Sequence, residues 1–573
     1  MEWPQCDAMR RIDAWALPLL VTIGVVIPFG VALVSGSLVI PHNDDFNYRR
    51  VALQLYRYGS VELTGWTVMS LIGQLLLVQP FLWLTGGASW AFGVMTTLIA
   101  AVGIVASYFL VRPILSAERA FIAVLTVIVF PGFVLNTWNF MTDLPAYAAA
   151  MVCLVLGAPV LRRHESNSWP WLAASLATGV FAFSIREFAL AAPVAVLMAA
   201  IVTHGPRRSY LVAAVVLFVS CGAVYYLTSH LPGQGVPALT PLSAWNIHQI
   251  FRAVATLALG LSPILVLSTA WWLPRANPLH WFVGGIIGIL LFNPYLLAWL
   301  SGAIPEMVVG NLLAQVGAPG SGVMAGDRPV LFVDPLWALI NASALLSAIL
   351  LFVVLGAIIG TAGRRGLLRR PLVAYRRIDA WSKLLVGLTV VYASGLLAFG
   401  LVASMFDRYL WPLALPLGAL LLTKPRWVDR SEIVPSSRRL GLSSVIAGVL
   451  LMGLTVSAFA LLLNAAAFDA ARWRLGEVTV SRGFPRETVD AGMEWVGYHA
   501  NGPATVWAPL TQGGMWYSSW WNSHTTCVAV SSSLLDLPGF TLYFADTQAY
   551  RLFLFAGPEA PLYLYRVANP GCS

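Results

Sequence analysis

Long apolar stretches recur along this chain of 573 residues, and they restrict it to a fold that is solvated mainly by lipid. The first stretch runs from Ala16 to Ile40, longer than the about 20 apolar residues that cross a bilayer core of about 30 Å as a helix. Charged residues make up 10% of the chain, against about 25% in a typical soluble protein. So few charges cannot cover a water-facing surface, and we expect a polytopic α-helical membrane protein.

The apolar stretches of helical length predict about thirteen membrane spans, at residues 16–40, 89–111, 120–136, 144–161, 169–185, 188–203, 210–229, 253–273, 280–300, 336–360, 384–404, 409–423 and 441–465. The stretch 67–85 is expected to lie in the membrane interface or as a re-entrant segment, because counting it as a span would invert every later loop. The first stretch exceeds the about 7–15 apolar residues of a signal peptide, so we expect it to be retained as an anchor.

Basic residues indicate the orientation of the chain. With the N-terminus placed inside, the inner loops hold 21 of the 34 Lys and Arg residues, and the outer loops between spans hold seven. An excess of Lys and Arg in short loops marks the cytoplasmic side. We therefore expect a plasma (inner) membrane protein with a cytoplasmic N-terminus and an extracytoplasmic or periplasmic C-terminus. The net charge of +9 does not indicate nucleic-acid binding, because the basic residues are spread over these loops.

The polar C-terminal region predicts a second structural unit. Residues 1–465 form the expected transmembrane module, and 466–573 form an expected small extracytoplasmic α/β domain. Residues 486–499 favour a helix, and short alternating runs favour strands at 477–481, 504–507, 526–531, 541–544, 551–555 and 562–567. Cys527 and Cys572 are the two cysteines in this region, so they are disulfide candidates if it lies outside the cytoplasm.

Two adjacent carboxylates, Asp44 and Asp45, follow the first span in the sequence His42-Asn43-Asp44-Asp45. Such a pair is electrostatically costly at a membrane surface, since mutual repulsion raises the pKa of one member unless a cation compensates. The pair is therefore a candidate reaction centre. The alternative is structural: either aspartate would serve as the N-cap of an amphipathic helix over residues 46–58.

Other ionisable residues lie at outer ends of predicted spans. Asp143 precedes Leu-Pro, where it is either a site residue or a helix cap. Arg186 and Glu187 stand between two spans and are either site residues or a salt bridge with each other. Arg408, followed by Tyr409, suits bidentate phosphate binding, or else it pairs with the neighbouring Asp407.

Together these segments resemble the GT-C superfamily of integral membrane glycosyltransferases, in the branch of protein O-mannosyltransferases and lipid A aminoarabinose transferases. The resemblance rests on the acid pair after the first span, on Phe-Met-Thr-Asp-Leu-Pro at 140–145, and on Arg-Tyr-Leu-Trp-Pro at 408–412. The segment Asp-Ala-Gly-Met-Glu-Trp at 490–495 is similar to one in C-terminal domains of bacterial relatives.

The resemblance implies an inverting transfer of a sugar from a polyprenyl-phosphate donor to an acceptor hydroxyl, on the outer face of the membrane. It implies Asp44 as the base, Asp45 as a group that positions the acceptor or binds a divalent cation, and Asp143 as a second catalytic acid. Whether a metal cofactor is used stays open. The residues expected to bind substrate are His42, Tyr48, Arg49, Arg50, Arg186, Glu187, Arg408 and Tyr409.

The acceptor is a glycan, a lipid or a protein, and membrane lipids are the remaining expected partners. A polymerase or ligase of lipid-linked glycans is the nearest alternative enzyme, although Arg and His would be expected to dominate its outer loops. A transporter would carry ionisable residues near span centres, which here are nearly free of charge. A structural protein would share the membrane fold but would not explain the outer acids.

Overall fold

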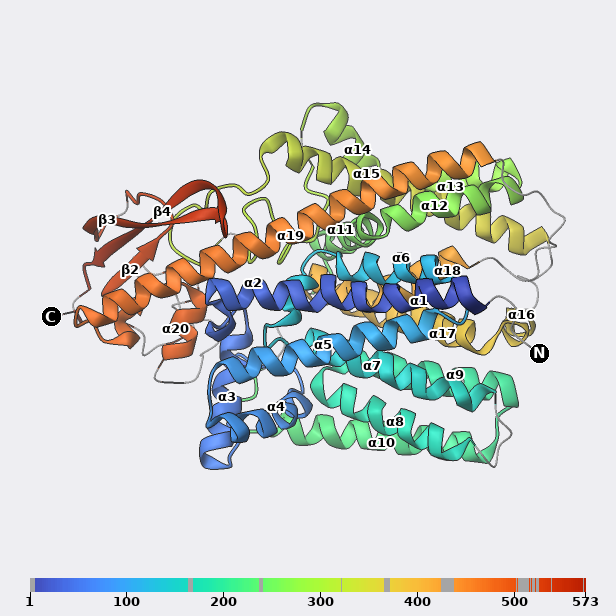
Figure 1. Ribbon diagram of the computed structural model, residues 1–573, viewed down its shortest axis with the longest axis horizontal. Helices are drawn as coiled ribbons and strands as arrows, with labels where there is room; N and C mark the ends of the chain where they lie inside the picture. Colours follow the sequence, from blue (N-terminus) through green and yellow to red (C-terminus); the bar gives the residue numbers. More distant parts are fainter. Residues whose placement is uncertain are drawn as a thin grey trace.

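The computed structural model describes most of the chain as a long helical bundle with a small sheet at one end (Figure 1). The described residues are 6–162, 168–235, 241–303, 305–320, 322–364, 371–423, 437–500, 502, 515, 517, 521, 525–536, 538–569 and 571–572. The helix α1 begins at one end of the long axis, and the sheet lies at the other. This separation is required of a chain whose ends lie on opposite sides of a bilayer; which side each end faces stays a prediction.

The helices of the N-terminal half are α1 (Cys6–Val21), α2 (Ile27–Ser35), α3 (Asp45–Tyr58), α4 (Ile72–Thr85), α5 (Trp90–Val111), α6 (Ala117–Ile128), α7 (Asp143–Gly157), α8 (Trp169–Ile185), α9 (Ala191–His204) and α10 (Arg208–Ser229). Those that follow are α11 (Ala244–Gly260), α12 (Ser262–Trp272), α13 (Pro278–Leu291), α14 (Asn293–Leu300), α15 (Asp334–Arg364), α16 (Pro371–Arg377), α17 (Ala380–Gly400), α18 (Trp411–Leu422), α19 (Ser437–Ser481) and α20 (Met493–His499).

Eight of the described helices are long and apolar enough to cross a membrane, and two bent pairs bring the number to ten. The pairs are α11 with α12 and α13 with α14, bent by 75° and 71°. The other three predicted spans correspond to α6, α8 and α18, of 12, 17 and 12 residues. At 1.5 Å per residue, 12 residues extend only about 18 Å, less than a bilayer core of about 30 Å. The helical membrane fold is therefore confirmed, while the count of thirteen spans stays a prediction.

The described residues of the C-terminal region form a four-stranded sheet with the strand order β1-β2-β4-β3. The strands are β1 (Val489–Asp490), β2 (Val528–Ser531), β3 (Phe540–Phe553) and β4 (Ala556–Val567). The pair β1–β2 is parallel, and β4 is antiparallel to both β2 and β3. The two runs predicted at 541–544 and 551–555 belong to the single strand β3, and the run predicted at 504–507 lies outside the described residues. Cys527 and Cys572 form a disulfide, as the sequence suggested.

The helix α19 joins the membrane bundle to the sheet without a break, and it runs almost the full length of the molecule (Figure 1). Its last turns replace the strand predicted at 477–481, a difference that arises because Leu475 and the side chains before it pack at helical spacing against the sheet. The expected boundary at residue 465 lies inside this helix. The membrane bundle and the C-terminal domain therefore share one continuous element.

A second contact between the two parts is made by α3, which packs against α20 of the C-terminal domain. Phe46 of α3 is buried with Val496 and Trp521 in one small apolar cluster. Gly497 allows this close approach, since a Cβ at that position would lie 2.2 Å from the Phe46 ring. The N-terminal end of α3, where the acid pair lies, is thereby held between the bundle and the domain.

Candidate active site

The acid pair lies in a tight turn that gives its two carboxylates opposite surroundings. Asn43 has a φ of 52°, in the left-handed region that asparagine tolerates better than most residues. The Asp45 amide donates to the His42 carbonyl oxygen at 3.2 Å and closes the turn before α3 begins. As a result the Asp45 side chain turns into the protein, while the Asp44 side chain turns toward residues of two other segments.

Asp44 meets a cation and an indole. Its Oδ2 accepts from Nη2 of Arg408 at 3.0 Å, and its Oδ1 accepts from Nε1 of Trp66 at 3.1 Å. Asp44 stands at the N-cap position of α3, but its side chain makes no capping hydrogen bond. Asp44 therefore occupies the predicted N-cap position, while its carboxylate bonds to Arg408 and Trp66 and not to the helix. The side chain keeps 15% of its exposure, so the carboxylate is reachable from outside the protein.

Asp45 is buried and hydrogen-bonded within the protein, which argues against its expected catalytic role, while its metal-binding role stays a prediction. Its Oδ1 accepts from the His42 amide at 2.6 Å. Its Oδ2 accepts from Arg49 at 3.0 Å and from the Phe140 amide at 3.1 Å, and the side chain has no exposure. Burial raises the pKa of Asp45, although Arg49 opposes that shift. Because its side chain has no exposure and both oxygens accept from the protein, Asp45 is a poorer candidate for contact with a substrate than the partly exposed Asp44.

Asp143 at the start of α7 pairs with an arginine from the end of α8. Its Oδ2 accepts from Nη1 of Arg186 at 2.9 Å, and the same nitrogen donates to Oγ1 of Thr142 at 2.7 Å. Asp143 is 1% exposed, and its Oδ1 is buried without a hydrogen-bond partner. The expected Arg186–Glu187 salt bridge is wrong, because Glu187 instead accepts from the amide and hydroxyl of Ser70, each at 2.7 Å.

Arg408 lies between the two carboxylates and retains unused donors. Besides its bond to Asp44, its Nε lies 3.9 Å from Oδ2 of Asp143. The side chain is 5% exposed, yet its Nε and Nη1 are buried without hydrogen-bond partners. A buried guanidinium with unsatisfied N–H groups is costly unless a ligand completes its bonds. Each of these donors shares an edge of the planar guanidinium with Nη2, and such an edge is the geometry that binds a phosphate.

The neighbouring Asp407 fixes the backbone and leaves the Arg408 side chain free for the site. Oδ2 of Asp407 accepts from the amides of Leu312 and Leu313, each at 2.8 Å, and its Oδ1 accepts from the Arg408 amide at 2.7 Å. The expected pairing of the Asp407 and Arg408 side chains is therefore not the one observed. Burial raises the pKa of Asp407 to about 6, against the opposing effect of these hydrogen bonds.

Two tyrosines complete the cluster around the charged groups. The Arg186 guanidinium lies 5.0 Å from the centre of the Tyr409 ring. Tyr48 is 1% exposed, and burial, followed by the charge of Asp44, raises the pKa of its phenol well above the ordinary value. Its hydroxyl therefore stays neutral and able to donate. The cluster thus combines two carboxylates, two guanidiniums and neutral aromatic groups from four separate parts of the chain.

Four residues expected to bind substrate lie outside this cluster. The His42 ring bonds to Asp469 and the Ser37 carbonyl, and Arg49 bonds to Asp45. Arg50 donates to the Gly497 carbonyl oxygen at 2.7 Å, and Glu187 holds Ser70 as described above. Each of these four side chains already has a hydrogen-bond partner within the protein.

The sequence did not single out Trp66 or Thr142 as contributors to the site. Thr142 lies inside the motif at 140–145, so its proximity to Asp143 was available as a signal. Trp66 had no such signal, because it follows α3 in an irregular segment. No group of three or more His, Cys, Asp or Glu side chains that could hold a metal ion occurs within the described ranges. Whether the site binds a divalent cation stays a prediction.

Comparison with known proteins identifies part of the chain. Residues 74–232 match the family model described as dolichyl-phosphate-mannose-protein mannosyltransferase. Over these residues the chain is similar to that family. The matched segment contains Asp143 and Arg186, and it contains neither Asp44 nor Arg408. A search of curated proteins finds no significant match.

Solved structures with a similar arrangement include two membrane proteins. ArnT from Cupriavidus metallidurans bound to undecaprenyl phosphate is 14% identical, with 96% of this chain and 98% of that chain covered and a TM-score of 0.37. AglB from Archaeoglobus fulgidus, an archaeal oligosaccharyltransferase in complex with an inhibitory peptide and a dolichol-phosphate, is 14% identical, with 91% and 65% covered and a TM-score of 0.39. Similarity this low assigns no role to any residue of the present chain.

Proposed function

We propose that the protein transfers a sugar from a polyprenyl-phosphate donor to an acceptor hydroxyl at the outer membrane surface. The observation that carries the proposal is the buried Arg408 guanidinium, which binds Asp44 and holds two further N–H groups without partners. The description of the family that matches residues 74–232 names a lipid-phosphate sugar, which supports the same donor class. The predicted orientation of the chain supports the outer face.

In this proposal Arg408 binds the phosphate that leaves. As the bond between the anomeric carbon and the phosphate oxygen breaks, the electron pair goes to that oxygen, and the guanidinium stabilises the growing negative charge. Arg186 adds a second positive charge near the site, held there by Asp143. The unpartnered Oδ1 of Asp143 is available to accept from a hydroxyl of the sugar.

Asp44 is the proposed general base. The acceptor oxygen attacks the anomeric carbon from the face opposite the phosphate, so the configuration inverts, and the acceptor proton passes to the Asp44 carboxylate. A base must lie within about 2.6–3.2 Å of the oxygen it deprotonates. The partly exposed Asp44 allows that approach, whereas the fully buried Asp45 does not. One guanidinium that holds both Asp44 and the phosphate also fixes the base relative to the leaving group.

The experiment uses the purified full-length protein in lipid vesicles, with synthetic polyprenyl-phosphate pentoses and hexoses and a cell-envelope extract as the acceptor source. We expect release of polyprenyl phosphate and labelled acceptor, and loss of both in Asp44→Asn. Asp13→Asn is the matched control, because Asp13 pairs with Arg112 near the opposite end of the bundle. No consumption of any donor by the wild type would refute the function, and full activity in Asp44→Asn would refute the assignment of the base.

A further inference from the structure

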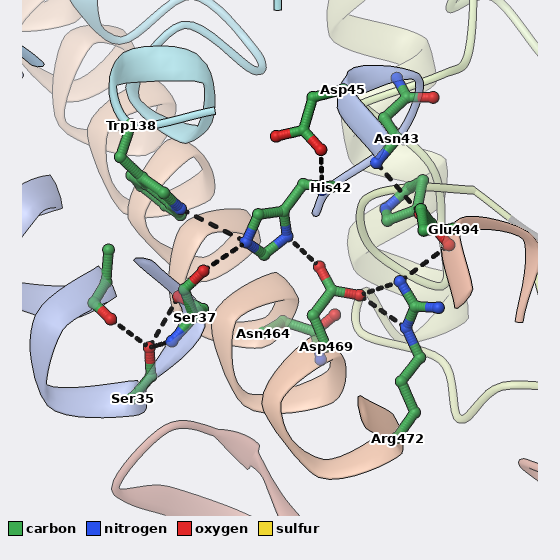
Figure 2. A network of polar contacts seen from close by, with 12 residues as sticks. Ser35, Ser37, His42, Asn43, Asp45, Trp138, Asn464, Asp469, Arg472 and Glu494 are labelled. Carbon is green, nitrogen blue, oxygen red and sulfur yellow. Dashed lines mark hydrogen bonds and ion pairs between the residues drawn. The ribbon is translucent and has the colours of Figure 1, made fainter. Parts of the chain in front are cut away.

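The turn that carries Asp44 is held by two carboxylates from distant parts of the chain (Figure 2). Nδ1 of His42 lies 2.5 Å from Oδ2 of Asp469 on α19. The Asn43 amide donates to Oε1 of Glu494 on α20 at 3.1 Å. These contacts hold the two residues that directly precede the proposed base. The first belongs to the long shared helix and the second to the C-terminal domain.

Arg472 connects the two carboxylates into one network. Its Nη2 lies 2.8 Å from Oδ1 of Asp469 and 2.8 Å from Oε2 of Glu494. The side chains of Asp469, Arg472 and Glu494 are at most 1% exposed. Burial lowers the pKa of His42, but the charge of Asp469 and the hydrogen bond to it outweigh burial and raise the pKa above the ordinary value. The network therefore joins the carboxylates of Asp469 and Glu494 to Arg472 and to the His42 ring inside the protein.

The backbone at Asn43 needs such support. A non-glycine residue with a φ of 52° is strained unless its surroundings hold it. The hydrogen bond from the Asn43 amide to Glu494 acts on the peptide that joins His42 to Asn43. A rotation of this peptide would move Asp44, the next residue along the chain. The Asp44 carboxylate reaches Arg408 at 3.0 Å, and a movement of about 1 Å would break that bond.

We propose that Glu494 of the C-terminal domain is a positioning residue for Asp44 and acts through the Asn43 amide, an inference that rests on the proposed function. Glu494 does not approach the Arg408 cluster by any contact among the described residues, so its effect is on the placement of the base. The C-terminal domain is on this proposal a working part of the active site, and α20 is the element that reaches it.

The test compares two double variants that differ by one hydrogen-bonding group. Arg472→Met with Glu494→Gln removes both charges but keeps an amide oxygen that accepts from Asn43. Arg472→Met with Glu494→Met removes the charges and the acceptor, with side chains of nearly the same size. Removing a buried pair together avoids leaving one charge uncompensated. Both variants leave Asp469 with His42 as its partner, so their remaining difference is the bond to Asn43.

We expect kcat of the Glu494→Met double variant to be about tenfold below that of the Glu494→Gln double variant, which is the effect of one lost hydrogen bond. The KM for the polyprenyl-phosphate sugar should agree within about twofold, because Arg408 is untouched. Glu477→Gln is the control for removal of a charge in the same region, since Glu477 pairs with Arg486 at the exposed end of α19. Equal kcat in the two double variants would overturn the proposal.

Hydrogen exchange gives a readout that needs no enzymatic activity. In the wild type the Asn43 amide should exchange as slowly as the bundle core, and in the Glu494→Met double variant it should exchange faster than in the Glu494→Gln one. Rapid exchange of this amide in the wild type would overturn the proposal even if neither variant folds. If the wild type transfers no sugar while the amide is protected, the proposed function fails and the anchoring by Glu494 stands.

Discussion

Replacing Arg408 by lysine separates phosphate binding from charge balance. The lysine keeps one positive charge near Asp44 and Asp143, so the carboxylates stay compensated and the protein should fold. It cannot supply the planar guanidinium edge, although Arg408 has no hydrogen-bond partner at Nε or Nη1. The expected defect is therefore in the reaction of the donor and much less in stability.

The magnitude follows from the two unused donors. A hydrogen bond that involves charged groups contributes about 1.5–3 kcal/mol. If the leaving phosphate uses two guanidinium donors in the transition state and the lysine ammonium replaces one of them, Arg408→Lys loses about 1.5–3 kcal/mol of stabilisation. Since about 1.4 kcal/mol corresponds to a factor of ten, kcat/KM for the donor should fall by about 10- to 10²-fold.

The assay measures kcat/KM for a polyprenyl-phosphate sugar with purified protein, alongside the thermal unfolding temperature in detergent. Arg112→Lys is the matched control, because Arg112 pairs with Asp13 away from the proposed site. The reasoning is refuted if Arg408→Lys keeps a near wild-type kcat/KM. It is also refuted if the loss of activity matches the loss of folded protein, as a structural role alone would produce.

Three further outcomes are expected. Asp45→Ala should reduce the amount of folded protein but not the kcat of the molecules that fold, because Asp45 joins Arg49 to the Phe140 amide. Size-exclusion chromatography measures the yield of folded protein, and active-site titration gives the kcat per folded molecule. Burial raises the pKa of Asp490 to about 6. The native state therefore binds the Asp490 proton more tightly than the unfolded state does. The free energy of unfolding should then fall by up to about 3 kcal/mol as the pH rises from about 4 to 6. Asp490→Asn should flatten this part of the unfolding profile, and an unchanged slope would contradict it. Replacing Cys527 and Cys572 by alanine should destabilise the C-terminal domain by about 4 kcal/mol, because their sequence separation of 45 makes a long closed loop. A denaturant unfolding curve that matches the wild type would contradict this prediction.

The sequence predicted which segments meet at the site better than it predicted what each residue does there. Asp44, Asp143 and Arg408 were singled out because ionisable residues are costly at the ends of apolar spans, and the structure brings them together with Arg186 and Tyr48. Their chemical roles stay predictions. Composition and the order of residues along the chain are thus enough to predict that polar residues at the ends of spans are buried.

The direction of each side chain was not predictable in the same way. Asp44 and Asp45 are adjacent and identical, and only the left-handed backbone of Asn43 decides which one faces Arg408. His42 was expected to bind substrate, yet its ring contacts Asp469, which lies 427 residues away in the sequence. Such contacts form only when α19 and α20 pack against the turn, and no local sequence pattern predicts that packing.

The unbroken α19 has a consequence for how this protein can be divided. A soluble fragment cut at residue 466 would begin inside the helix, and a membrane fragment ending there would lose Asp469, Arg472 and Glu494 together. The boundary at residue 465 that the composition suggests therefore does not coincide with a break in the helix. If a thinner or thicker bilayer changes the tilt of α19, the end of the helix next to the sheet and the His42 turn attached to the helix would move together.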